Sequence, residues 1–163
     1  LFVSSQTTVL GAGDGLPTIS STEVQYMLPY PGVLPDSPWY FLKVIRDGVT
    51  LTVVRNEPER SFYEVFLADK RIAAAERLFA KGKFPLAAVT AMKAEEFLRE
   101  AVDRNFDKKK HSDLIAKIAV AKTKHREILR KIMMKYSSRE TEQAWDDNEF
   151  VNKRIMNVLI SKQ

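Results

Sequence analysis

Cysteine is absent from this 163-residue chain, which also has only two histidines. Without cysteine the fold contains no disulfide, no thiolate metal site and no cysteine nucleophile. Outside the N-terminal segment, no apolar run is long enough to span a bilayer. The sequence also lacks an HExxH pair, a phosphate-cradling glycine-rich loop and a G-x-S-x-G elbow, and these absences exclude the enzyme classes that such motifs mark.

The chain has the length of one domain with a core of its own. Residues 1–23 contain few periodic apolar positions and are rich in Gly, Ser and Thr. They predict a disordered arm or a signal-peptide remnant followed by a linker, and residues 9–12 resemble the end of a signal peptide. Residues 24–163 are expected to form a single helical domain.

Five segments carry helical signals. Helices are predicted over residues 38–54, from the Asn56 cap to Gly82, from Pro85 to about residue 101, over residues 112–136, and in a final segment of which residues 144–159 face inward. Short connections between long amphipathic helices favour antiparallel neighbours. The predicted fold is therefore all-α, an antiparallel bundle of four to five helices with an extended N-terminal strap.

The strap, residues 28–39, crowds prolines and aromatics into one short apolar segment. Each proline fixes its own φ and keeps the preceding residue out of the α region, so the strap is expected to be extended up to a helix beginning at Pro38. We expect residues 28–34 to pack in a groove between the first helix and the hairpin of the second and third helices, with Tyr30 and Trp39 as anchors. The structural strap residues are Pro29, Tyr30, Pro31, Gly32, Pro35, Ser37, Pro38 and Trp39.

The strap resembles the signature LPYPG-x-LPDSP-x-Y-x-LK of a bacterial family catalogued as a domain of unknown function. The similarity continues through the ADKR segment at residues 68–71 and the KGK turn at residues 81–83, and covers residues 26–102. Members of this family resemble exported proteins of bacteria with small genomes. The resemblance implies export and assigns no activity, cofactor or catalytic residue.

His125 lies at the centre of the apolar stripe predicted for residues 112–136. A buried imidazole needs a hydrogen-bond partner, and the favoured interpretation is a structural one. The alternative is a metal ligand or general base working with an acid of the second helix, Asp69 or Glu76. The Glu-x-x-His pairs of di-iron bundles are absent, because neither His111 nor His125 follows an acid by three residues.

Positive charge is concentrated between residues 108 and 135, where ten basic residues and two acidic ones give +8 against +5 for the chain. Two interpretations are open: the long cationic stems cover the edges of a core, or they bind anionic lipid headgroups or a cell-wall polymer. No nucleic-acid-reading helix motif is present. The candidate anion-binding strip consists of Lys117, Lys124, Lys131, Lys135, Lys122, Arg126 and Arg130.

These features together predict a non-enzymatic helical binding or scaffolding module of a bacterium, with no catalytic residue, cofactor or metal. The resemblance places it outside the cytoplasm, either secreted or tethered to a membrane. The alternative is a metal-binding or catalytic bundle centred on His125 and an acid of the second helix. The expected partners are an anionic membrane surface, a cell-wall polymer or another exported protein, and not nucleic acid.

Overall fold

The computed structural model describes residues 26–104, 107–108 and 110–160. This part of the chain contains five α-helices and no strand, which confirms the all-α prediction. The segment expected to be an arm or signal-peptide remnant, residues 1–23, lies outside the described residues. The helices are α1 (Tyr40–Val53), α2 (Glu57–Ala80), α3 (Phe84–Asp103), α4 (Ser112–Lys135) and α5 (Arg139–Ile160).

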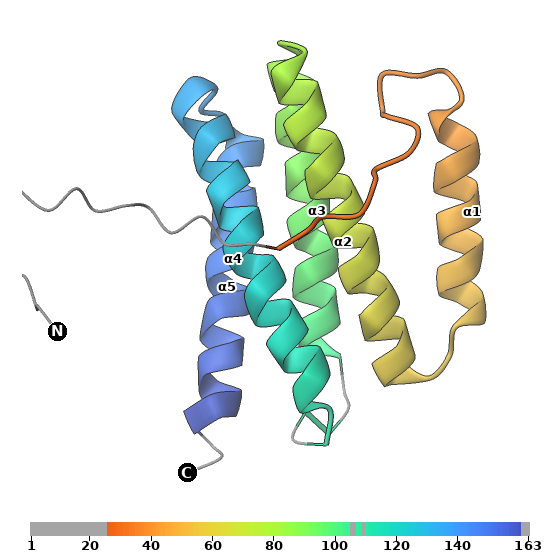
Figure 1. Ribbon diagram of the computed structural model, residues 1–163, viewed down its shortest axis with the longest axis vertical. Coiled ribbons are helices and arrows are strands. Elements are labelled where there is room, and N and C mark those ends of the chain that lie inside the picture. Colours follow the sequence, from red (N-terminus) through yellow and green to blue (C-terminus); the bar gives the residue numbers. More distant parts are fainter. Residues whose placement is uncertain (1–25, 105–106, 109, 161–163) are drawn as a thin grey trace, which may run out of the picture.

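Helices α2 to α5 form a four-helix body in which successive helices run in opposite directions (Figure 1). The extensive contacts join α2 to α3 and α4, and α5 to α3 and α4, while α3 also approaches α4 across the centre. Helix α1 takes part in none of these contacts and stands beside α2 at the edge of the molecule (Figure 1). The fold is thus a compact body with one peripheral helix.

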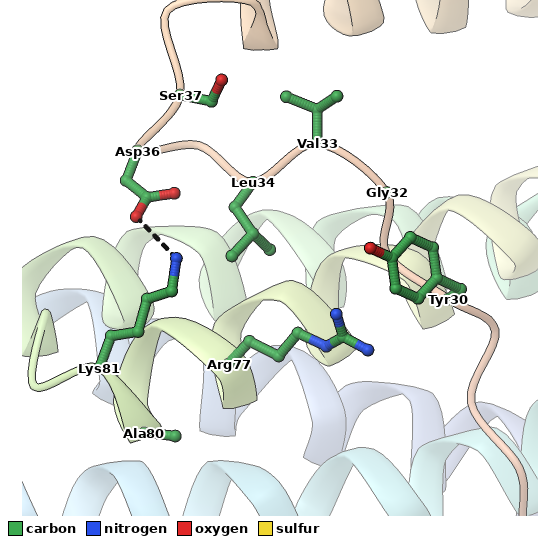
Figure 2. Close-up of a pocket in the computed structure, with 9 residues that line it drawn as sticks. All are labelled: Tyr30, Gly32, Val33, Leu34, Asp36, Ser37, Arg77, Ala80 and Lys81. Atoms are coloured by element: carbon green, nitrogen blue, oxygen red, sulfur yellow. Dashed lines mark hydrogen bonds and ion pairs between the residues drawn. The ribbon is translucent and has the colours of Figure 1, made fainter.

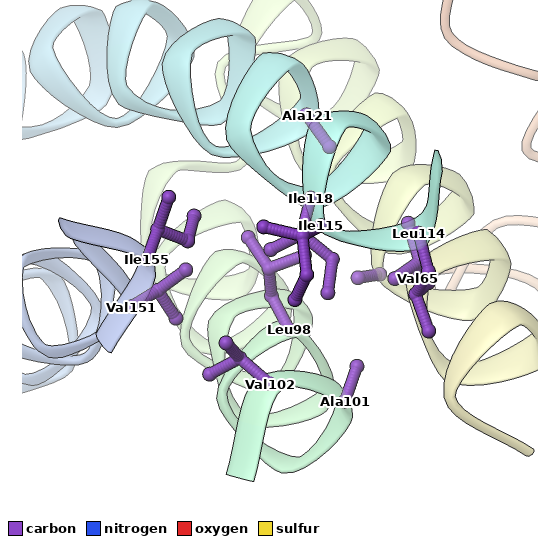
Figure 3. Packing of buried hydrophobic residues seen from close by; sticks show 11 residues of the cluster. Val65, Leu98, Ala101, Val102, Leu114, Ile115, Ile118, Ala121, Val151 and Ile155 are labelled. Carbon is purple, nitrogen blue, oxygen red and sulfur yellow. The ribbon is translucent and has the colours of Figure 1, made fainter. Parts of the chain in front are cut away.

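The core of the body consists of two apolar clusters stacked along the bundle axis. One cluster gathers Val65, Leu98, Ile118 and Val151 from all four helices, as Figure 3 shows. The other contains Ile72, Ala91, Ile128 and Ala144, again one from each helix. Small residues on α2 and α3 allow their backbones to approach closely, and these two helices share the largest contact.

The C-terminal end of α2 and the N-terminal start of α5 follow from local sequence. Gly82 has a φ of +74°, and the backbone N–H groups of Gly82 and Lys83 donate to the carbonyls of Phe79 and Leu78. This pattern is a Schellman motif, so the predicted stop at Gly82 is confirmed. Before α5, Ser138 and Thr141 exchange backbone-to-side-chain hydrogen bonds and cap the helix start.

Helix α1 begins at Tyr40, two residues later than predicted. The N–H of Ser37 donates to the carbonyl of Leu34 (3.0 Å), and the Ser37 carbonyl accepts from Tyr40 (3.1 Å), so residues 34–40 form turns before the helix. The Ser37 hydroxyl accepts a long hydrogen bond of 3.4 Å from the Trp39 N–H. Pro38 therefore belongs to this turn and is not the first residue of the helix.

Within the described residues, no helix combines the length and the apolar character needed to cross a membrane.

Candidate functional site

A layer of polar side chains lies between the two apolar clusters, at mid-height in the body. His125 on α4 is its centre, because its Nδ1 lies 2.8 Å from Oε1 of Glu95 and its Nε2 lies 3.0 Å from Oδ1 of Asp69. The side-chain amide of Asn148 donates to Oε2 of Glu95 (2.9 Å), and the Tyr26 hydroxyl donates to Oδ2 of Asp69 (2.6 Å). This polar layer, residues 26, 69, 95, 125 and 148, joins all four helices of the body and the segment before the strap.

The four helical members of the polar layer are buried, and the layer holds charge. His125 and Glu95 are fully buried, and Asp69 is 3% exposed. Burial by itself lowers the pKa of His125, but the charges of Glu95 and Asp69 and their hydrogen bonds outweigh burial and raise this pKa to about 9. Burial, followed by the hydrogen bond to Asp69 and its charge, raises the pKa of the Tyr26 hydroxyl. At neutral pH the layer therefore contains an imidazolium between two acidic side chains.

Both ring nitrogens of His125 are engaged by carboxylates, and this geometry favours a structural role over metal binding. An imidazolium that donates from both ring nitrogens has no lone pair to offer a metal ion. Among the described residues, no group of three or more His, Cys, Asp or Glu side chains is placed to hold a metal ion. Asp69 is the acid of α2 that contacts His125, whereas Glu76 lies 4.0 Å from Lys131.

Three members of the polar layer were missed by the sequence analysis. Glu95 stands on the inward stripe of α3 between Ala94 and Leu98, in the way that His125 stands on the stripe of α4. Asn148 occupies the corresponding place on α5, between Ala144 and Val151. A polar residue on or beside an apolar stripe was thus the signal for all of the helical members, and it led to His125 and Asp69 but not to Glu95 or Asn148.

The strap crosses α2 on its way to α1 (Figure 1), but its anchors are not the predicted ones. Tyr30 is 69% exposed and Trp39 is 66% exposed, so the expectation that they anchor the strap is wrong. Pro31 is buried, and Leu28 packs against the cluster that contains Ile72. The strap is held at its start by apolar contact and by the neighbouring Tyr26, because those positions face the body.

Beyond Pro31 the strap arches away from α2 and leaves an open pocket of about 740 Å³ (Figure 2). The guanidinium of Arg77 lies 4.5 Å from the centre of the Tyr30 ring, which accounts for the position of this exposed aromatic. At the other end Asp36 accepts from Lys83 and Lys81, and these hydrogen bonds lower the pKa of its carboxyl group. The pocket is therefore a shallow space under a strap fixed at both ends.

The predicted cationic strip lies on α4, and its side chains contact α2 along one edge and α5 along the other. Lys117 lies over the Phe62 ring of α2 at 5.9 Å, and Lys131 lies 4.0 Å from Glu76 of the same helix. On the other edge, Lys122 donates to Asn152 and Arg126 pairs with Glu149, both on α5. Lys124 pairs with Glu127, while Arg130 and Lys135 are exposed. Much of the strip thus covers the edges of the core, and anion binding by it stays a prediction.

Helix α1 differs from the helices of the body in the side that it turns inward, because a polar side faces the protein and an apolar side faces solvent. Its only buried residue is Asp47, which accepts a hydrogen bond of 2.8 Å from Arg46. Lys43 on the same side donates to the Pro31 carbonyl of the strap (2.6 Å). Seven large apolar residues of α1 and its N-cap are instead 43% or more exposed: Trp39, Phe41, Leu42, Val44, Ile45, Val49 and Val53. We call these seven residues the α1 apolar face.

A family model catalogued as a domain of unknown function, DUF5667, matches residues 32–139, from the strap to the start of α5. The match continues beyond residue 102, where the sequence resemblance was expected to end. No curated protein and no solved structure matches the chain significantly. Since the family match covers more than half of the sequence, the chain belongs to the DUF5667 family.

Proposed function

We propose that this protein is a non-enzymatic helical module of a bacterium that works outside the cytoplasm by binding a partner through the α1 apolar face. One observation carries the proposal, namely that α1 turns its polar side inward and leaves seven large apolar side chains exposed on one element. Single exposed apolar residues are common, but a contiguous apolar surface marks an interaction site. The extracytoplasmic location rests on the sequence resemblance.

The geometry of the polar layer weighs against the alternative of a metal-binding or catalytic bundle. A general base must reach its substrate, whereas His125 is fully buried and both of its ring nitrogens contact carboxylates. The layer contributes what a body built on small apolar residues needs, which is a specific polar contact among four helices. The partner-binding surface is therefore expected on the outside of the molecule.

Binding of the apolar dye ANS tests the exposure of the α1 apolar face. The wild-type protein should enhance the fluorescence of the dye, and the double substitution Ile45→Asp and Val49→Asp should remove most of that enhancement. The double substitution Met134→Asp and Met156→Asp is the matched control, since both methionines are exposed on α4 and α5. Equal enhancement by wild type and the α1 variant would contradict the proposal.

Nitrogen NMR of the His125 ring tests the structural interpretation of the polar layer. Both ring nitrogens should stay protonated at pH 7, and equimolar Zn²⁺ should shift neither their resonances nor the melting temperature. Stoichiometric metal on His125 would instead support the alternative function.

Detection of the native protein by antibody in fractions of the producing cell tests its location, and recovery in the cytoplasmic fraction alone would contradict export.

A further inference from the structure

We propose that the partner of the α1 apolar face is the surface of an anionic lipid bilayer, on which α1 lies parallel to the membrane plane. This inference rests on the proposed function, because it names the occupant of the same face. Three properties of the described structure support it: the distribution of apolar side chains around α1, the sign of its exposed charges, and its length.

Most of the large apolar side chains of α1 occupy the side that faces away from the body. Phe41, Ile45, Val49 and Val53 recur at steps of four residues and so form one row along the helix, and Leu42 lies beside this row. The opposite side of the helix carries Tyr40, Lys43, Asp47, Thr50 and Leu51, all half-buried or buried. A helix with this division sits at a membrane interface with its apolar side toward the acyl chains.

The only mainly exposed charged residue on α1 itself is positive. Arg46 is exposed on the margin of the apolar face, and Arg55 is exposed just beyond the C-terminal end of α1. The single acidic residue of α1, Asp47, is buried and paired with Arg46. The face that α1 presents therefore combines apolar groups with cations and no exposed carboxylate, which complements anionic headgroups.

The same charges make a second copy of the chain a poorer occupant. Two α1 faces placed against each other would bring together two apolar rows bordered by arginines, and neither helix offers an exposed acid to pair with them. Like charges across an interface disfavour association. An anionic bilayer supplies the missing negative charge and also an apolar layer.

Length decides how α1 meets the membrane. A helix of 14 residues is about 21 Å long, shorter than the hydrocarbon core of about 30 Å. Its polar side is also occupied by contacts with the strap, through Lys43 and the Pro31 carbonyl. Helix α1 therefore lies in the interface and does not insert across it, with Trp39 at its N-terminal end at the depth that indole rings prefer.

Tryptophan fluorescence makes this geometry measurable. The chain has two tryptophans, Trp39 on the α1 apolar face and half-buried Trp145, which stacks against Arg126 at 4.3 Å. In a Trp145→Phe background of the full chain, Trp39 becomes the sole reporter. Vesicles of phosphatidylglycerol and phosphatidylcholine should shift its emission to the blue, whereas vesicles of phosphatidylcholine alone should give a much weaker shift, reduced further by salt.

Substitutions assign the binding to α1. Ile45→Asp with Val49→Asp should weaken binding to the anionic vesicles by at least about tenfold, because two apolar side chains of the row that enters the bilayer are lost. The exposed control pair Met134→Asp and Met156→Asp should bind as the wild type does. Arg46→Gln with Arg55→Gln should weaken binding by about tenfold at low salt. The triple substitution of Lys117, Lys124 and Lys131 by Gln should leave the Trp39 shift in place.

Three results would overturn the lipid assignment. The first is the absence of a blue shift on anionic vesicles in a protein whose ANS binding is sensitive to the α1 substitutions. This result would show that the partner is not an anionic bilayer, while the α1 apolar face would remain a binding surface. Loss of binding in the lysine triple variant with normal binding by the α1 variant would move the site to α4. Sedimentation equilibrium showing a dimer that Ile45→Asp and Val49→Asp dissociate would assign the face to a second copy. Absence of ANS binding would instead contradict the proposed function itself.

Discussion

The four-helix body and α1 each bury charged side chains, but they do so under opposite conditions. In the body, His125, Asp69 and Glu95 are surrounded by apolar residues, and every charge faces an opposite one. In α1, the polar side with Asp47 is turned inward and the apolar side is left outside. The charged side chains at the centre of the body are thus paired with one another, whereas α1 has apolar surface that only something outside the described residues can cover.

This difference separates stability from binding. Changes in the polar layer should alter the free energy of unfolding, because a buried charge without its partner is costly. Changes on the α1 apolar face should alter binding and leave unfolding almost unaffected, because these side chains are already in contact with solvent. Five substitutions or conditions can break or sharpen this contrast, and they are given from the largest expected effect to the smallest.

The strongest perturbation is His125→Ala. It removes the cation and leaves Glu95 and Asp69 buried without compensation, which is expected to cost about 3 to 5 kcal/mol of unfolding free energy. Urea denaturation followed by circular dichroism measures this loss. Glu95→Gln keeps the shape of the side chain and serves as a milder comparison. A loss below about 1 kcal/mol for His125→Ala would show that the layer is open to water.

Alkaline pH should lower the free energy of unfolding of the wild-type protein, because it also removes the positive charge of His125. The pKa of His125 is about 9 in the folded state against 6.5 for an ordinary histidine, so the folded state binds this proton more tightly than the unfolded state does. The resulting stabilisation is complete below pH 6.5 and is lost as the pH rises through 9, by roughly 3 kcal/mol in all. Urea denaturation at a series of pH values should show this decline, and His125→Ala should lack it.

Tyr26→Phe tests the connection between the polar layer and the N-terminal segment. The substitution keeps the ring and removes the hydroxyl that donates to Asp69. A hydrogen bond to a charged group contributes about 1.5 to 3 kcal/mol, and thermal or urea unfolding should show a loss of that size. If the variant unfolds as the wild type does, the hydroxyl does not hold this segment on the body.

Tyr30→Ala should have a smaller effect than Tyr26→Phe, although it removes more atoms. Tyr30 is mainly exposed, and its described contact is the stacking with Arg77. Such a contact contributes about 0.5 to 1 kcal/mol at an exposed site. Melting temperatures of the two variants, measured side by side, check the order. A larger loss for Tyr30→Ala would restore Tyr30 as an anchor of the strap.

The smallest effect on stability is expected from Ile45→Asp with Val49→Asp. Both side chains are more than half exposed, so the double substitution should change the free energy of unfolding by no more than about 0.5 kcal/mol for each residue. The same substitution at Ile118 or Ile128, both in the core, would prevent folding. Clear destabilisation of the α1 variant would show that α1 packs against the body through its apolar side.

The sequence predicted the body well because its signals are local. The cap at Gly82 and the regular stripes of α2, α3 and α4 were sufficient to place the helices and their inward faces. Asp69 was found as a partner of His125 by the same reasoning. Glu95 and Asn148 each carried a signal within their own helix, but their pairing with His125 depends on how the four helices align. Tyr26 belongs to a separate segment, and periodicity within one helix does not show where that segment joins the body.

The strap and α1 were predicted less well. Aromatic residues usually pack, so Tyr30 and Trp39 were expected to be anchors, yet they are mainly exposed. Periodicity shows that a helix is amphipathic, but it does not show which side faces the protein. In α1 the hydrogen bond from Lys43 to the Pro31 carbonyl and the burial of Asp47 mark the side that faces the protein. Such an inversion becomes visible only when the neighbouring elements are placed.

The mid-height position of the polar layer selects one axial alignment of the four helices. Stripes of alanine, leucine and isoleucine would tolerate a relative shift of α4 and α2 by one turn, about 5.4 Å. Such a shift would place His125 opposite Val65 or Ala73 in place of Asp69, and its charge would be buried without that carboxylate. In coiled coils a single buried polar residue fixes the register in this manner, at some cost in stability. Asp69 is also the acceptor for Tyr26, so the alignment that matches the helices also fixes where the N-terminal segment joins the body and from which side the chain approaches α1.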